Sequence, residues 1–131
     1  MSRLQLAAIG ISIAGVAISI YLTFLHYAGV EPACVTSGPV NCEAVLASPY
    51  AVIFGSSIPT SALGIAWFGA SAVVWARPRG WIQLAWSAVG LVAALYLVYI
   101  EIVLVGAICL WCTAAHVLVV ALVLIAVSTR R

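Results

Sequence analysis

Long apolar runs separated by short polar stretches dominate the hydrophobic pattern of this chain. The runs cover residues 4–27, 59–76, 81–107 and 109–128. A helix rises 1.5 Å per residue, so about 20 apolar residues cross the ~30 Å hydrocarbon core of a bilayer, and runs of about 18 already indicate spans. The pattern therefore predicts an all-α integral membrane protein, a bundle of four transmembrane helices.

Residues 28–58 form the only long polar segment between the runs. Its prolines and glycines are typical of a loop with at most short helices. We expect one such helix at 42–47, because Asn41 is a suitable N-cap and Glu43 would lie in the first turn, while Pro49 would stop the helix. The segment is predicted to be an external cap made of loop and short helix.

Side-chain size and type indicate how the helices pack and where they meet the membrane surface. Membrane helices approach each other closely at small residues. The first run carries four: Gly10, Ala14, Gly15 and Ser19. Tryptophans near span ends often form belts at the interface. Three near the predicted inner ends fit that pattern: Trp75, Trp81 and Trp86.

Composition and charge support a single membrane domain and suggest its orientation. The 131 residues are 66% hydrophobic and 6% charged, which excludes a water-soluble domain, and a net charge of +2 is too small to suggest nucleic acid. With four spans, all basic residues fall on one side, which the positive-inside rule makes cytoplasmic, together with both termini. These residues are Arg3, Arg77, Arg79, Arg130 and Arg131.

The four cysteines are then all external, where disulfides can form. Cys34 and Cys42 lie in the 28–58 loop, and Cys109 and Cys112 start the fourth run. Cys-x-x-Cys spacing on a helix places both sulfurs on one face, and a helix N-terminus favours the thiolate. Two structural bridges, or cysteines that act as small buried apolar residues, are alternatives. A bridge that closes so short a loop stabilises little, which favours a redox couple.

The order and spacing of several motifs resemble the vitamin K epoxide reductase family over nearly the whole chain, and we expect residues 1–131 to form a single domain of this type. The motifs are Cys34-x7-Cys42, Ser48 six residues later, Pro59-x-Ser61-x-x-Gly64 and Cys109-x-x-Cys112. The resemblance implies a membrane thiol oxidoreductase that passes electrons from protein thiols to a quinone held in the helix bundle, which supports disulfide formation. The quinone would be of the menaquinone, ubiquinone or vitamin K type, in the cell or inner membrane.

The resemblance also implies a role for each cysteine. Cys109 and Cys112 would be the pair next to the quinone, and Cys34 and Cys42 the pair that shuttles electrons to them. Ser48 would lie beside the quinone. No metal is implied. Bacterial members often carry a fused thioredoxin-like domain, whereas this chain ends at Arg131, so we expect a thioredoxin-fold partner in trans.

The chain departs from the family at two positions that contact the quinone headgroup. Where eukaryotic members carry a tyrosine four residues after the last cysteine, this chain has His116. Where they carry an asparagine before the serine of the second helix, Ser61, it has Thr60. We therefore expect Thr60, Ser61 and His116 to bind the quinone together with Ser48.

Two other functions fit parts of the pattern. A DsbB-type quinone-linked oxidase also has four helices and two cysteine pairs, but its Cys-x-x-Cys lies in the first external loop, which reverses the order seen here. A membrane scaffold with inert bridges is the non-enzymatic alternative, and its disulfides would not respond to quinone.

Two polar residues in the apolar runs remain ambiguous from sequence. His116 lies one helical turn below Cys112, and the sequence does not distinguish a packing role from a functional role for it. Glu101 lies roughly 9 Å inside the outer end of the third run. A carboxylate there is costly and is a functional candidate, unless it simply bonds to a neighbouring helix.

Overall fold

Helices make up most of the protein in a computed structural model, which describes residues 2–30, 33–34, 37–53, 55–77 and 80–129. The helices α2 and η1 are short and belong to the 28–58 segment, η1 being a single 3-10 turn. The π-helical η2 continues α4 directly. In chain order the elements are α1 (Arg3–Ala28), α2 (Cys42–Leu46), η1 (Pro49–Ala51), α3 (Thr60–Ala76), α4 (Trp81–Tyr99), η2 (Ile100–Val105) and α5 (Leu110–Thr129).

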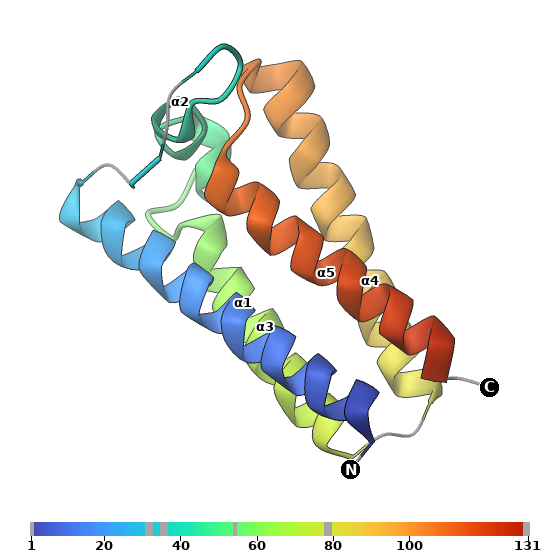
Figure 1. Cartoon of the computed structure of the whole chain (residues 1–131). Helices are drawn as coiled ribbons and strands as arrows, with labels where there is room; N and C mark the ends of the chain where they lie inside the picture. Colours follow the sequence, from blue (N-terminus) through green and yellow to red (C-terminus); the bar gives the residue numbers. More distant parts are fainter. Residues whose placement is uncertain (1, 31–32, 35–36, 54, 78–79, 130–131) are drawn as a thin grey trace.

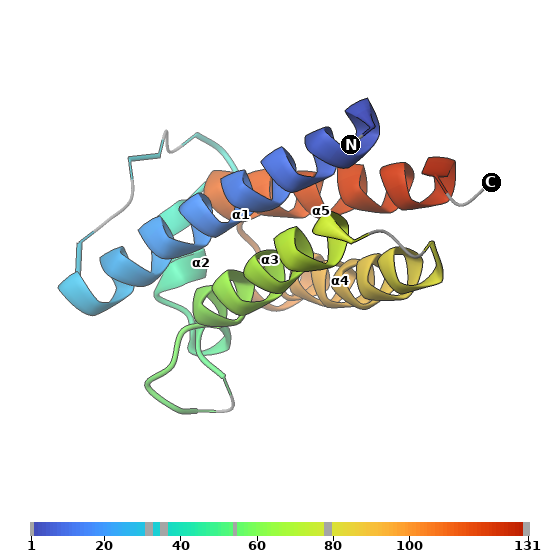
Figure 2. The ribbon, with the colours of Figure 1, turned by 90° about the horizontal axis from the view of Figure 1, so that it is seen from below.

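The four long helices alternate in direction, so both chain ends lie at the same end of the molecule (Figure 1). Helices α1 and α3 lie side by side, α5 packs against α1 and α4, and the view from below shows the same neighbours (Figure 2). The short α2 covers the opposite end of the bundle. This arrangement confirms the predicted all-α fold and the position of the loop cap.

Three helical stretches are long and apolar enough to cross a membrane. They are α1, the stretch Trp81–Val105 formed by α4 and η2, and α5, with mean hydropathies of 2.1, 2.5 and 2.5. Helix α3 is apolar but has only 17 residues. The length and hydropathy of these helices therefore indicate an integral membrane protein. That α3 also crosses the membrane, which would give four spans, stays a prediction.

Helices α1 and α3 meet through small residues, as the sequence predicted in part. A Cβ atom added to Gly15 would overlap the ring of Phe68, and one added to Gly64 would approach the Ser19 hydroxyl. Helix backbones that come this close gain van der Waals contact. The other two predicted small residues are exposed, and that part of the prediction is wrong: Gly10 and Ala14.

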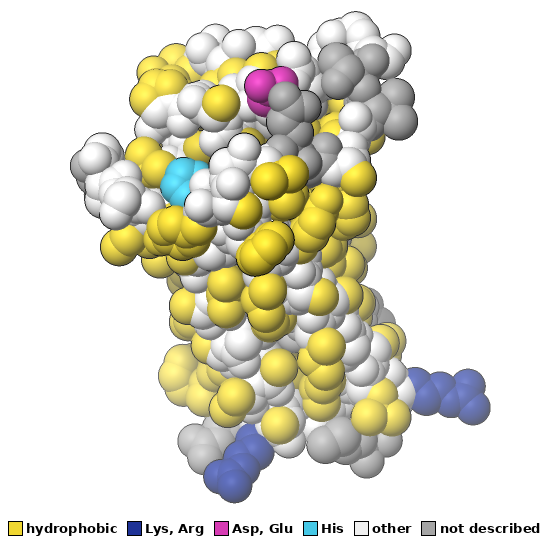
Figure 3. Space-filling view, turned by 90° about the vertical axis from the view of Figure 1, so that its left-hand side faces the viewer, with side chains coloured by type: hydrophobic (Ala, Val, Ile, Leu, Met, Phe, Trp, Pro, Cys, Tyr) yellow, Lys and Arg dark blue, Asp and Glu magenta, His cyan; other side chains and the backbone are white. Residues whose placement is uncertain are grey.

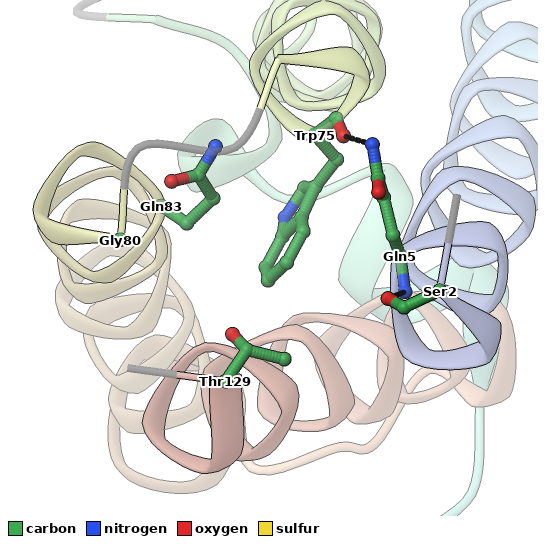
Figure 4. A pocket seen from close by; sticks show the side chains of 6 residues that line it. All are labelled: Ser2, Gln5, Trp75, Gly80, Gln83 and Thr129. Carbon is green, nitrogen blue, oxygen red and sulfur yellow. Dashed lines mark hydrogen bonds between the residues drawn. The ribbon is translucent and has the colours of Figure 1, made fainter. Parts of the chain in front are cut away.

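The end of the bundle that holds both termini is built around Trp75. Its side chain is only 2% exposed and belongs to the main apolar core, so the prediction that Trp75 forms part of an interfacial belt is wrong. Gln5 Nε2 donates to Trp75 O at 2.9 Å, which ties the start of α1 to the end of α3 (Figure 4). Trp81 is 68% exposed, as a belt residue would be.

The opposite end is closed by contacts between the loop and the segment before α5. Asn41 N–H donates to Ile108 O at 2.9 Å, and Ile108 N–H donates to Pro39 O at 2.8 Å. The Asn41 side chain accepts from Ala44 N–H at 3.1 Å, which confirms the predicted N-cap. Helix α2 thus starts where the sequence predicted and is anchored beside the start of α5.

Several predicted helix boundaries were displaced, each by one or two residues, and three of the shifts have a local cause. The third run was expected to reach residue 107, but η2 ends at Val105 because Gly106 turns to φ 75°, a left-handed conformation that favours glycine. The second run was expected to start at Pro59, which instead has an extended backbone as the N-cap of α3. The fourth starts at Leu110 rather than Cys109, because Ile108 is held in an extended pairing with Val40.

Charge is distributed unevenly between the two ends of the molecule. The arginine side chains that the structure describes, Arg3 and Arg77, belong to the end that holds the termini, and an acidic side chain is visible at the other end (Figure 3). This polarity is the one that the positive-inside prediction requires. Which end faces the cytoplasm stays a prediction.

Candidate redox site

The loop cysteines form one covalent pair. Cys34 and Cys42 are joined by a disulfide with a Cα–Cα distance of 6.3 Å. Cys42 is the first residue of α2 and is 1% exposed, so the cap that Asn41 provides also fixes the position of this sulfur. The disulfide lies at the end of the bundle covered by α2.

The second cysteine pair consists of two thiols at the start of α5. Cys109 is fully buried and immediately precedes the helix. Its sulfur accepts a hydrogen bond from Cys112 N–H, at an N···S distance of 3.3 Å, and its carbonyl accepts from Thr113 N–H at 2.9 Å. Cys109 therefore occupies the N-cap position, where its sulfur faces a free N–H group of the first turn.

The contacts of Cys109 favour its thiolate. The hydrogen bond from the Cys112 thiol lowers the pKa of Cys109, and the N–H groups of the first turn of α5 act in the same direction. Burial and the nearby Glu101 carboxylate oppose this shift, but the net pKa lies below that of an ordinary thiol. Cys109 is thus the sulfur of this pair that carries negative charge most easily.

The two cysteine pairs meet at the N-terminus of α5. Leu110 N–H donates to Cys42 Sγ at an N···S distance of 3.3 Å. Cys42 and Cys109 share one buried apolar cluster with Val45 and Ala107, against which the other two cysteines also pack: Cys34 and Cys112. Thiol–disulfide exchange needs an attacking sulfur within reach of a disulfide, and this cluster brings the sulfurs of both pairs together.

Glu101 joins this junction from the π-helical turn η2. Its side chain is 5% exposed, and Oε2 accepts a hydrogen bond from Cys109 N–H at 3.4 Å. The sequence marked Glu101 as a costly buried carboxylate but gave no sign of its partner. The contact depends on Gly106, which folds the chain back so that Ala107 N–H donates to Glu101 O at 3.0 Å.

A cavity of about 350 Å³ opens between the end of α4 and α5. Binding pockets for small molecules start at roughly this size and are mostly apolar with a few polar groups. Ile102 and Val117 are each 60% exposed at its rim, on the surface that faces lipid in a bilayer. The lining residues are Val98, Glu101, Ile102, Ile108, Thr113, His116, Val117 and Val120.

The other predicted quinone-binding residues lie elsewhere in the described structure. Ser48 Oγ donates to Val45 O at 2.7 Å beside α2. Ser61 bonds to Thr23 at 2.8 Å between α3 and α1, and Thr60 is the first residue of α3. Of the four residues expected to bind quinone, only His116 belongs to the described lining of the cavity beside η2.

A second cavity, of about 210 Å³, lies at the opposite end of the bundle (Figure 4). Gln5, Trp75 and Gln83 line it, together with Ser2, Gly80 and Thr129. All four cysteines belong to the other end of the protein. The cavity that bears on sulfur chemistry is therefore the one beside η2.

Apolar helices that bring two cysteine pairs together at one helix junction are typical of membrane proteins with cysteine redox chemistry, and this protein is of that class. Comparison of its sequence with protein families identifies the particular family. A sequence model described as Vitamin K epoxide reductase family matches residues 6–127, and the chain belongs to this family. Its members are oxidoreductases that use quinones and act on protein thiols, so the family resemblance seen in the sequence is confirmed and a DsbB-type assignment is not favoured.

Proposed function

We propose that this protein is a membrane thiol:quinone oxidoreductase, which oxidises the thiols of a partner protein and thereby supports disulfide formation. One contact carries the proposal. The sulfur of Cys42, part of a disulfide, lies against the first N–H of α5, next to the Cys109 thiol. A scaffold with two structural bridges would have no use for two pairs that share one buried cluster.

The proposed route passes electrons through both pairs. A partner dithiol attacks Cys34, breaks the Cys34–Cys42 disulfide and leaves with its own sulfurs joined. The Cys42 thiolate then attacks Cys109 of an oxidised Cys109–Cys112 pair, and Cys112 leaves as a thiolate. Cys34 next attacks Cys42, which restores the loop disulfide and frees Cys109. The loop disulfide and the Cys109 and Cys112 thiols of the structure correspond to this last state.

The reduced pair at the start of α5 must then be oxidised. A bound quinone supplies the acceptor, taking up two electrons and two protons to become a hydroquinone. The cavity beside η2 fits such a group, because it is mainly apolar and opens at an exposed apolar rim. We propose that His116 donates a hydrogen bond to a quinone oxygen there, as the one predicted quinone-binding residue in the described lining of this cavity.

The partner is proposed to be a thioredoxin-fold protein that works in trans on the external side. Four spans, with α3 among them, would place both termini in the cytoplasm and the α2 cap outside. The alternating directions of the four long helices support this topology, because they bring α2 and the start of α5 to the same end.

The function is tested with the purified chain, a reduced thioredoxin-fold protein and a short-chain ubiquinone. We expect one quinone to be reduced for each partner disulfide formed, with no turnover for Cys109→Ser or Cys34→Ser. Thr129→Ser, at the far end of the bundle, is the matched control and should turn over normally. If both cysteine pairs keep their redox state whether or not quinone is added, the protein is a scaffold with inert bridges.

A further inference from the structure

Glu101 stands between the thiol pair and the cavity proposed for quinone. Its Oε2 atom meets the backbone N–H of Cys109 at 3.4 Å, and its side chain also lines the 350 Å³ cavity together with His116. A carboxyl group in this position can exchange a proton with either side.

None of the arginines that the structure describes lies near Glu101 to hold the charge of its carboxylate. The arginines that the structure describes, Arg3 and Arg77, belong to the other end of the bundle. The titratable groups on the elements around η2 are the thiols of Cys109 and Cys112 and the imidazole of His116. Three further titratable residues are exposed on α2 and α4: Glu43, Tyr96 and Tyr99. Burying a carboxylate without a cationic partner is costly, so this site favours a carboxylate that takes up a proton.

We propose that Glu101 is the proton acceptor for the Cys109 thiol when the Cys109–Cys112 disulfide forms, and that it returns this proton toward the cavity. The inference rests on the proposed function. Joining two thiols releases two electrons and two protons, all of which the quinone takes up. The Cys109 proton moves first to the Glu101 carboxylate and then to one quinone oxygen, while the Cys112 proton goes to the other oxygen.

The π-helical turn is what makes this placement possible. A regular α-helix would continue past Glu101 with its side chain on the helix surface, whereas η2 widens and ends at Gly106 within one turn. The chain then returns, so that Cys109 N–H points back at the Glu101 carboxylate. π-Turns inside α-helices are frequently found at functional sites.

The test separates proton transfer from positioning with two substitutions in the full chain. Glu101→Gln keeps an oxygen that accepts from Cys109 N–H but cannot take up a proton. Glu101→Asp keeps a carboxyl group on a shorter side chain. Each variant is reduced, mixed with short-chain ubiquinone in a single turnover, and followed by quinone absorbance over a range of pH.

We expect Glu101→Gln to slow quinone reduction by about 10²-fold or more, the usual contribution of a positioned base, and to lose the acid limb of the pH profile. Glu101→Asp should keep that limb at a reduced rate. Exchange between the partner and the Cys34–Cys42 disulfide should be unchanged in both variants, which shows that the fold is intact.

A second readout, without quinone, excludes a purely electrostatic or structural role. The Glu101 charge raises the pKa of Cys109, so Glu101→Gln should let the Cys109 thiolate form at lower pH, measured by ultraviolet thiolate absorbance against Cys109→Ser. A more easily ionised thiol that nevertheless reduces quinone more slowly supports the proposal. A Glu101→Gln variant with the wild-type rate and pH profile overturns it. A wild-type protein that reduces no quinone overturns the proposed function instead.

Discussion

At the scale of single residues, the chemistry of this protein depends on Cys109. Its sulfur accepts from Cys112 N–H, its backbone N–H donates to Glu101, and the next residue donates to the sulfur of Cys42. All three contacts arise because Cys109 precedes α5 instead of lying within it. The helix N-terminus is left with free N–H groups, and here sulfur and carboxylate atoms occupy them.

The lowered pKa of Cys109 predicts a pH dependence. A thiol with a lowered pKa is ionised at lower pH, so its thiolate should persist below the pH of about 8.5 at which an ordinary cysteine is half ionised. Cys112→Ala removes the thiol that donates to Cys109, and we expect it to move ionisation to higher pH. Ultraviolet thiolate absorbance measures both, with Cys109→Ser as the reference. A midpoint that does not move would show that the Cys112 thiol has no part in the shift.

The order of electron transfer is tested by removing one loop cysteine at a time, with the Cys109–Cys112 pair oxidised at the start. In Cys34→Ser the thiol that displaces Cys109 from Cys42 is missing, so the mixed disulfide between Cys42 and Cys109 should accumulate. In Cys42→Ser no thiol is left to attack Cys109, so the Cys109–Cys112 disulfide should persist. Non-reducing digestion and mass spectrometry identify both species. A dominant Cys34–Cys109 disulfide in Cys42→Ser would reverse the roles of the loop cysteines.

At the scale of helices, close packing of α1 and α3 sets the frame for the site. Small residues on both helices let the backbones approach, and a hydroxyl pair, Ser12 Oγ to Ser71 Oγ at 3.0 Å, bonds across the contact. Helix α5 packs against α1 and α4, so the frame of α1 and α3 also fixes where α5, and with it the thiol pair, begins.

Gly15 and Gly10 offer a matched test of this packing. Gly15→Ala adds a methyl group that overlaps the Phe68 ring, and overpacking typically costs about 1–3 kcal/mol. Gly10→Ala adds the same group on the same helix with no described atom within 4 Å, and should leave stability unchanged or raise it by up to ~1 kcal/mol. Thermal unfolding in detergent compares the two. Equal melting temperatures would show that Phe68 moves aside at no cost.

At the scale of the whole molecule, the two ends have different tasks. The end that holds the termini carries the described arginines and a core around Trp75. The other end holds both cysteine pairs, the α2 cap and the carboxyl group of Glu101. Such polarity suits an enzyme that meets a protein partner on one side of a membrane and a lipid-soluble acceptor within it.

Labelling from one side tests the orientation and the crossing by α3 together. After mild reduction, a membrane-impermeant thiol reagent added outside intact cells should label Cys34, which is half-buried in the loop. Thr129→Cys in a cysteine-free chain places a thiol at the exposed end of α5, and it should react only after the membrane is permeabilised. Labelling of both from outside would place the termini on opposite sides and remove α3 from the set of spans.

What the sequence determined follows from short-range physics. Long apolar runs must form helices in lipid, because each backbone polar group needs a partner within its own segment. For the same reason α1, α4 with η2, and α5 could be predicted to within two residues, and Asn41 could be identified as the cap of α2. Cysteine order and spacing were enough to find the family.

What only the tertiary structure decided depends on contacts between residues far apart in the chain. The position of Trp75 near a helix end is equally compatible with an interfacial belt and with the apolar core. Its packing against residues of α1 and α5 places it in the core. Hydrophobic pattern gave no reason for Ser61 to bond to Thr23, nor for Glu101 to meet Cys109. That last contact needs a π-turn and a left-handed glycine together, and apolar periodicity does not record backbone conformation.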